Sequence, residues 1–278
     1  MVNIITDSTA DLGRDIATEF ELMVVPLLVT IGGKVYRDGM DIGQKELFAL
    51  VEKHGELPKT AAPSVGEFRK AFSRPGDSIF IGISSKLSAT IQNARIAAKM
   101  LPDGQVRVID TLNLSSGVGL LALRAAELCQ QGLTAERIEE VLLTSTGKVR
   151  TSFVIETMEY LYKGGRCTAL QAVAGSVLKI HPIIEVRPDG TLGVKEKAHG
   201  TIRKGLQMIL NDFVLNLAEL DNRRVFVTTT TNNEKDVQFL VDGINRSAAP
   251  QDIRVTRAGS VISSHCGPGT SGILYFIK

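Results

Sequence analysis

In the first half of the chain, segments with the apolar pattern of strands alternate with segments that have the apolar spacing of helices. Short β-branched runs predict strands at Val2–Thr6, Met23–Ile31, Lys34–Arg37, Ser78–Ile83 and Gln105–Asp110. Segments with helical spacing predict helices near Arg14–Phe20, at Gln44–His54, after the capping box of Ser64 and Glu67, and at Ser88–Met100, Ser116–Gln131 and Thr134–Thr146. Gly32 and Gly33 predict a hairpin turn. Repeated strand–helix units favour a three-layer domain with a parallel sheet and polar loops at its carboxyl edge.

The second half has a different rhythm, with strand pairs joined by turns. Strands are predicted at Thr151–Ile155, His181–Val186, Leu192–Lys195, Arg224–Thr230, Ile253–Arg257 and Ile273–Ile277. Helices are predicted at Thr168–Val177, Thr201–Ala218 and Glu234–Asn245, and Pro188-Asp189-Gly190 marks a turn. This pattern indicates an α+β layer with a largely antiparallel sheet. We therefore expect an α/β protein of two domains, residues 1–150 and 151–278.

Composition and charge narrow the function classes. With 32 Lys and Arg against 30 Asp and Glu, the net charge of the 278 residues is +2, which does not favour nucleic acid as a partner. Three widely spaced cysteines exclude a disulfide framework and suit a reducing cytosol. The amino terminus has no secretory pattern, and no apolar run approaches the ~20 residues of a membrane span. The expected location is cytoplasmic.

Common catalytic motifs are missing. The chain has neither a G-x-x-x-x-G-K-[ST] phosphate loop nor a G-x-S-x-G elbow. Gly267, Gly269 and Gly272 fit G-x-G-x-x-G, but a strand follows them where a dinucleotide site requires a helix. The four histidines show no metal-ligand spacing, so no metal centre is expected.

Polar loops at strand ends carry the remaining candidates. These loops are Thr6–Leu12, Thr60–Ser64 and Ser84–Thr90. The Ser88 hydroxyl and the free amides of Ala89 and Thr90, at a helix start, can form a small neutral anion site. The alternative is that Ser88 only caps the helix.

His265 and Arg166 are further candidates. His265 lies in Ser263–Gly269, predicted as a rigid loop between strands, and can face a ligand or bond to backbone. Cys266 beside it is a nucleophile candidate or a buried, inert thiol. Arg166 follows two glycines and either binds an acidic partner or is solvated.

A hydrolase is the alternative function that these residues leave open. It would use Ser88 or Cys266 as nucleophile and His265 as base, to act on acyl esters. It would also need an orienting acid, for which Asp7 and Asp110 are the strand-end candidates.

Several motifs together resemble the DegV family of bacterial fatty-acid-binding proteins, which includes the B subunit of fatty acid kinase. They occur in order along the whole chain: Thr6–Leu12, Asp38-Gly39, Thr60-x-x-Pro63-Ser64, Ile83–Thr90, Val108–Thr111, Gly164-Gly165-Arg166 and His265-x-Gly-Pro-Gly-x-x-Gly272. The resemblance implies two α/β domains with a long-chain fatty acid, such as palmitate, stearate or oleate, in a tunnel between them. It implies a binding subunit and not an enzyme by itself, with ATP and magnesium bound by a separate kinase subunit that forms acyl phosphate. Transient membrane contact is also consistent with it.

The resemblance also assigns roles to single residues. Thr60, Ser88 and the amide of Ala89 fall where the family holds the acyl carboxylate, and His265 falls near the head group. Arg166 falls on an arginine linked to the kinase partner. The chain departs from the family at Ala61 and Ala62, where polar residues are common. We expect the head-group geometry to survive these changes.

Overall fold

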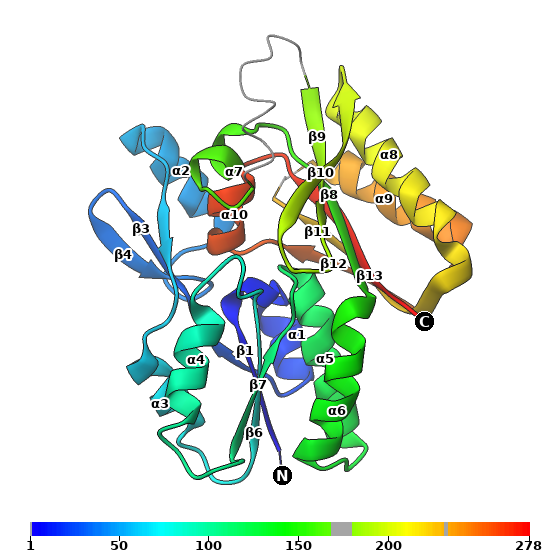
Figure 1. Ribbon diagram of the computed structural model, residues 1–278. Coiled ribbons are helices and arrows are strands. Elements are labelled where there is room, and N and C mark those ends of the chain that lie inside the picture. Colours follow the sequence, from blue (N-terminus) through cyan, green and yellow to red (C-terminus); the bar gives the residue numbers. More distant parts are fainter. Residues whose placement is uncertain (1, 168–179, 231–232) are drawn as a thin grey trace.

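The structure, a computed structural model, describes residues 2–167, 180–230 and 233–278 (Figure 1). The described residues form a four-stranded, a six-stranded and a three-stranded sheet. The predicted helix Thr168–Val177 lies outside the described residues.

The four-stranded sheet is parallel, with strand order β2-β1-β6-β7. Its strands are β1 (Asn3–Asp7), β2 (Met23–Val25), β6 (Ser78–Gly82) and β7 (Val106–Asp110). Its helices are α3 (Val65–Phe72), α4 (Thr90–Ala98), α5 (Ser116–Gln130) and α6 (Ala135–Ser145). Side chains alternate along β6, so that Ile79 and Ile81 join the core under α5 and α6, whereas Phe80 joins the core under α3 and α4. The helices thus cover both faces (Figure 1), which confirms the three-layer prediction.

The six-stranded sheet has the order β10-β9-β8-β13-β11-β12 and is antiparallel except for the β11–β12 pair. Its strands are β8 (Val149–Val154), β9 (Ile180–Val186), β10 (Leu192–His199), β11 (Leu220–Thr229), β12 (Asp252–Arg257) and β13 (Ser271–Ile277). Helices α8 (Ile202–Leu215) and α9 (Glu234–Ser247) cover one face. The largely antiparallel prediction is therefore confirmed. The boundary at residue 150 stays a prediction.

The small sheet, order β4-β3-β5, was only partly expected. It contains β3 (Leu28–Ile31), β4 (Lys34–Arg37) and β5 (Lys59–Ala61). The predicted single strand Met23–Ile31 is wrong, because the chain leaves the parallel sheet after Val25 and joins the small sheet at Leu28. Pro26 has no N–H for a ladder, and the Leu27 amide instead donates to Ser8 Oγ at 3.0 Å.

Five short helices complete the described fold. They are η1 (Ser8–Ala10), α1 (Gly13–Glu19), α2 (Gln44–His54), α7 (Glu159–Lys163) and α10 (Ser260–Cys266); single 3-10 turns follow α6 (Thr146–Lys148) and α8 (Leu217–Glu219). The predicted loop Ser263–Gly269 is wrong in its first part, because Ser263 to Cys266 belong to α10. Within the described ranges, no helix combines the length and apolar character needed to cross a bilayer.

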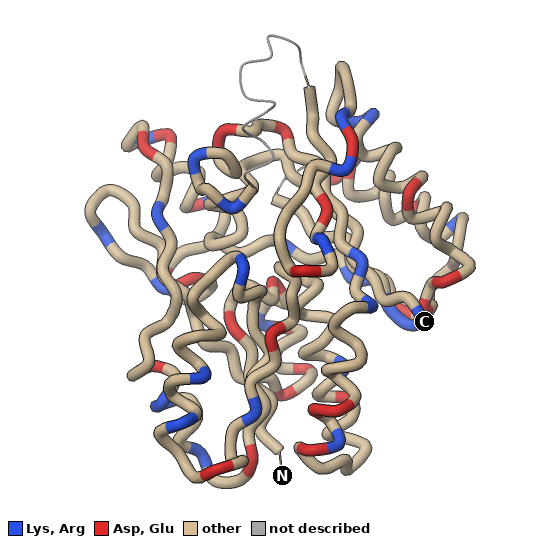
Figure 2. The backbone as a smooth tube through the Cα atoms, in the orientation of Figure 1, with Lys and Arg blue, Asp and Glu red and all other residues tan. Residues whose placement is uncertain are grey.

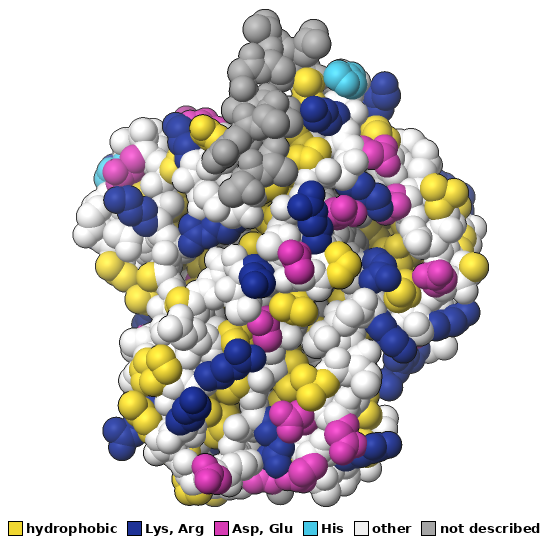
Figure 3. Space-filling view, viewed as in Figure 1, with side chains coloured by type: hydrophobic (Ala, Val, Ile, Leu, Met, Phe, Trp, Pro, Cys, Tyr) yellow, Lys and Arg dark blue, Asp and Glu magenta, His cyan; other side chains and the backbone are white. Residues whose placement is uncertain are grey.

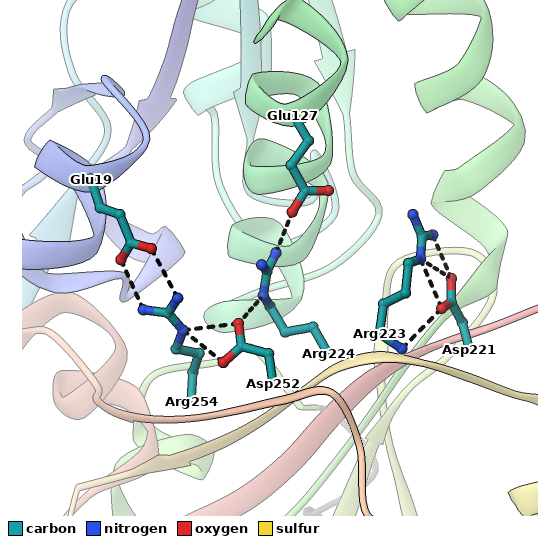
Figure 4. Close-up of polar contacts among 7 residues, drawn as sticks. All are labelled: Glu19, Glu127, Asp221, Arg223, Arg224, Asp252 and Arg254. Atoms are coloured by element: carbon teal, nitrogen blue, oxygen red, sulfur yellow. Dashed lines mark hydrogen bonds and ion pairs between the residues drawn. The ribbon is translucent and has the colours of Figure 1, made fainter. Parts of the chain in front are cut away.

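Helix α5 joins the two large sheets. It packs on β1 and β6 on one side and on β8, β11 and β13 on the other, within one continuous apolar core. An ion-pair network adds to this junction (Figure 4). Arg224 on β11 binds Glu127 of α5 at 2.8 Å and Asp252 of β12 at 2.7 Å. Arg254 on β12 bonds to the same Asp252 and, through both terminal nitrogens, to Glu19 of α1.

Candidate functional site

A cavity of about 220 Å³ lies where the small sheet, the loop before α4, α7 and α10 meet. Most of its lining is apolar: Leu27, Ala61, Ala62, Ile83, Leu87, Ala89, Leu114, Leu161, Leu192, Val261, Ile262 and Cys266. The other lining residues are Thr60, Ser88, Arg166 and His265. All five site residues singled out from the sequence therefore border one cavity, although they come from four separate segments.

Thr60 and His265 form a direct contact across 205 positions of sequence. Thr60 Oγ1 lies 2.8 Å from His265 Nε2, which joins β5 to α10. Burial, with a smaller effect from the charge of Arg166, lowers the pKa of His265 to about 4. The imidazole is therefore neutral at physiological pH, with one N–H and one acceptor nitrogen. Among the described residues, the buried Nδ1 atom has no hydrogen-bond partner.

The tautomer of His265 determines whether the Thr60 hydroxyl can donate a hydrogen bond to a ligand. A carboxylate only accepts hydrogen bonds, so the Thr60 hydroxyl must donate its proton to bind one. That requires the Thr60 oxygen to accept from an Nε2–H group of His265. In the tautomer with its proton on Nε2, the neutral imidazole would orient the hydroxyl as a donor toward an anion in the cavity.

Ser88 does not head a helix as the sequence predicted. Its amide donates to Ser84 O at 3.2 Å, which closes a turn, and α4 starts two residues later, at Thr90. The Ser88 hydroxyl receives the Thr90 amide at 3.3 Å and lies 2.8 Å from Thr90 Oγ1. Ala89 is the residue that precedes the first helical turn. Ser88 therefore stabilises the start of α4 and also faces the cavity.

Arg166 stands at the boundary between the cavity and the surface. Its Nε donates to Leu87 O at 3.4 Å and its Nη1 to Gly164 O at 2.5 Å. Gly164 packs against the His265 ring, since a Cβ atom there would lie 2.5 Å from Nδ1. The polar side chains thus gather at one end of the cavity, and Leu114, Ile262 and Cys266 also line a second, smaller void of about 30 Å³.

An open groove of about 630 Å³ adjoins the polar end and shares Leu87, Ser88, Ala89 and Arg166 with it. We call it the basic groove. Its lining contains four cations, Lys86, Arg95, Lys99 and Arg166, and no acidic residue. Figure 2 shows basic positions on α4 and next to it, and Figure 3 shows basic and apolar side chains next to each other on this face. Exposed Ile96 belongs to the same lining.

The arrangement needed by a hydrolase is not found in the described residues. Burial raises the pKa of Cys266 to about 12, so its thiol is not ionised at neutral pH. The hydroxyl of Ser88 bonds to Thr90 and not to His265. Asp7 accepts from the amides of Thr9 and Ile83, and no acid orients His265 Nδ1.

The apolar lining was not identified from the sequence. Leu27, Leu161 and Leu192 come from segments far apart in the chain, and of these three only Leu27 belongs to an apolar run. No local signal distinguishes them from core residues, since only the packed structure brings them together.

The protein is therefore a mixed α/β protein with a mostly apolar cavity, whose polar lining consists of hydroxyl, imidazole and guanidinium groups. A family model described as "Uncharacterised protein, DegV family" matches residues 1–278, and the chain therefore belongs to the DegV family. A DegV domain-containing protein of Caldanaerobacter subterraneus is 32% identical over 284 residues, 99% of this chain and 98% of the relative.

Solved structures agree with this assignment. A fatty-acid-binding DegV family protein from Thermus thermophilus is 32% identical, with a TM-score of 0.92 over 100% of this chain and 99% of its own. The Streptococcus pneumoniae fatty acid kinase B3 protein, loaded with linoleic acid, superposes with a TM-score of 0.88 over 100% of each chain. At 24% identity, that second likeness concerns the fold.

Proposed function

We propose that this protein binds a long-chain fatty acid in the cavity and presents its carboxylate to a separate ATP-dependent kinase subunit. The observation that carries the proposal is a cavity with a mostly apolar lining and a polar end beside the basic groove. Burial of a methylene group contributes ~0.8 kcal/mol, so a long acyl chain supplies most of the binding free energy by itself. Binding of fatty acids by the Thermus relative supports the ligand class.

The head-group site favours a carboxylate that stays reactive. The proposed donors are the hydroxyls of Thr60 and Ser88 and the amide of Ala89, all neutral. A close Arg–carboxylate pair would withdraw the charge needed for attack on phosphorus. In the transfer, a carboxylate oxygen forms a bond to the γ-phosphorus of ATP, and the bond from that phosphorus to the oxygen of the leaving ADP breaks. ATP and magnesium belong to the partner in this proposal.

The basic groove supports the proposed contact with a kinase subunit. Its cations lie beside the head-group residues, at the point where a partner must approach the carboxylate. Arg166 belongs to both the cavity lining and the groove, which suits a residue that contacts the kinase subunit. Any contact with a membrane would be transient, at an exposed face of this kind.

Two variants test fatty-acid binding and the contact with the kinase subunit separately. Ala62→Trp places a large ring in the cavity and is expected to abolish fatty-acid binding, whereas Ala218→Trp at an exposed 3-10 turn leaves binding unchanged. Arg166→Ala is expected to retain bound lipid and to lose acyl phosphate formation with a fatty acid kinase subunit, ATP and Mg²⁺. If Arg166→Ala loses its bound lipid, and the fraction that still holds lipid forms acyl phosphate normally with the kinase subunit, Arg166 does not serve the partner. Turnover of an acyl ester by the chain alone, abolished by His265→Ala, would favour the hydrolase instead.

A further inference from the structure

Two buried carboxylates of the first half of the chain meet at the start of α10. Asp11 follows η1 and Asp38 follows β4, and their exposed fractions are 4% and 2%. The Gly259 amide donates to Asp11 Oδ1 at 2.7 Å, and the Ser260 amide donates to Asp38 Oδ1 at 2.7 Å. The Ser260 hydroxyl also donates to Asp38 Oδ1, at 2.5 Å. The first amides of α10 are thereby bound by side chains more than 220 positions away in the sequence.

Helix α10 needs such an anchor. Its sequence from Ser260 to Cys266 contains three serines and two β-branched residues, which have low helix propensity. Side-chain oxygens that accept from the amides at a helix N-terminus satisfy donors that the helix leaves unpaired. His265 stands five residues after Ser260, about 7.5 Å along the axis at ~1.5 Å per residue. A shift at the anchor therefore moves the imidazole by a similar amount.

The small sheet holds α10 at both ends. Asp38 follows its strand β4 and binds the start of the helix, whereas Thr60 on its strand β5 contacts His265 near the end. The helix also packs against β3 and β5 along its length. Because the small sheet and the residue that follows it supply both contacts, we expect the separation of Thr60 and His265 to depend on the contact at Asp38.

We propose that Asp38, together with Asp11, is a positioning residue for the head-group site, which fixes α10 and so places the His265 imidazole against the Thr60 hydroxyl. Neither carboxylate lines the cavity. The expected effect on fatty-acid binding rests on the proposed function, whereas the effect on the position of the His265 ring does not.

Gly259 offers a variant that changes no charge. A Cβ atom at this position would lie 2.9 Å from Asp38 Oδ1 and 3.2 Å from Asp11 Oδ1, so alanine must push both carboxylates back. Its φ of −64° and ψ of 176° are accessible to alanine, so the backbone itself is not strained. Gly147 is the matched control, because it is exposed and a Cβ atom there meets nothing within 4 Å.

The test compares Gly259→Ala, Asp38→Ala and Gly147→Ala by two measurements. The first is the ¹⁵N spectrum of the His265 ring in lipid-free protein, assigned by the signals missing from His265→Gln. The second is the ratio of the dissociation constants of a fatty alcohol and a fatty acid of equal chain length. We expect Gly259→Ala and Asp38→Ala to shift the ring signals and to reduce the preference for the acid about tenfold, the loss of one hydrogen bond to a charged group. Gly147→Ala should change neither.

Unchanged ring signals and acid preference in Gly259→Ala, with only a lower melting temperature, would overturn the positioning role. Should Asp38→Ala not fold, Gly259→Ala carries the test alone. If the wild type binds neither lipid, the proposed function fails, and the ring signals still decide whether Asp38 positions His265.

Discussion

Removal of the Thr60 hydroxyl is the perturbation whose effect the site geometry defines best. Thr60→Val keeps the shape and β-branching of the side chain and suits its place in β5. It removes the donor to the carboxylate and leaves His265 Nε2 without the partner now at 2.8 Å. The change therefore affects both ligand binding and the buried imidazole.

The magnitudes follow from the hydrogen bonds that are lost. A bond to a charged group contributes ~1.5–3 kcal/mol, so the dissociation constant of the fatty acid should rise roughly 10- to 150-fold. The dissociation constant of the matching fatty alcohol should change much less. The unpaired Nε2 should lower the free energy of unfolding by about 1–3 kcal/mol.

Binding is measured by displacement of a fluorescent fatty acid, and stability by urea unfolding. Thr60→Ser retains the hydroxyl and should bind the acid nearly as the wild type does. Thr30→Val, on the neighbouring strand β3 and outside the cavity lining, is the matched control and should leave binding unchanged. Equal affinity of Thr60→Val and the wild type for the acid would show that Thr60 does not hold the carboxylate.

Three further predictions concern single residues. Ser88→Ala should cost ~1 kcal/mol of stability through the lost bond to the Thr90 amide. It should also reduce acyl phosphate formation by up to ~10²-fold, since a head group displaced by about 1 Å reacts poorly. A lower melting temperature with normal phosphoryl transfer would show that Ser88 has only a structural role. Burial raises the pKa of Asp7 to about 6, above the unfolded value of 3.8, so the folded state binds the extra proton and Asp7 favours folding increasingly as pH falls from 6 to 4. The difference in unfolding free energy between wild type and Asp7→Asn should therefore change by about 2 kcal/mol between pH 7 and pH 4, and a flat difference would contradict the burial argument. Arg224→Met removes one cation between two carboxylates (Figure 4). The loss should cost ~1–2 kcal/mol of stability, and less in high salt because the group is partly exposed. A loss of stability that salt does not reduce would contradict an ionic origin.

The sequence predicted the large elements because their signals are local. Helix α2 begins and ends at the predicted residues, and β6 was predicted with one extra residue at its end. Apolar periodicity and capping residues decide such elements within a few turns of chain.

The misjudged elements depend on distant contacts. Helix α10 has a sequence unfavourable to helix and is held by Asp11 and Asp38, so no local pattern shows it. The break at Pro26 was missed because both sides favour strand, and only the bond from Leu27 to Ser8 shows where the chain turns. Local sequence made Ser88, Ala89, Arg166 and His265 candidates, and the family resemblance added the role of Thr60. Their shared cavity is a property of the packing.

If the cavity holds a fatty acid, extraction of the purified protein recovers it. Protein expressed in bacterial cells is extracted with organic solvent, and the extract is quantified by mass spectrometry against a parallel preparation of Ala62→Trp. We expect close to one fatty acid per wild-type chain and little from the variant with the filled cavity. Recovery of no stoichiometric fatty acid from the wild type, or of equal amounts from both proteins, would contradict it.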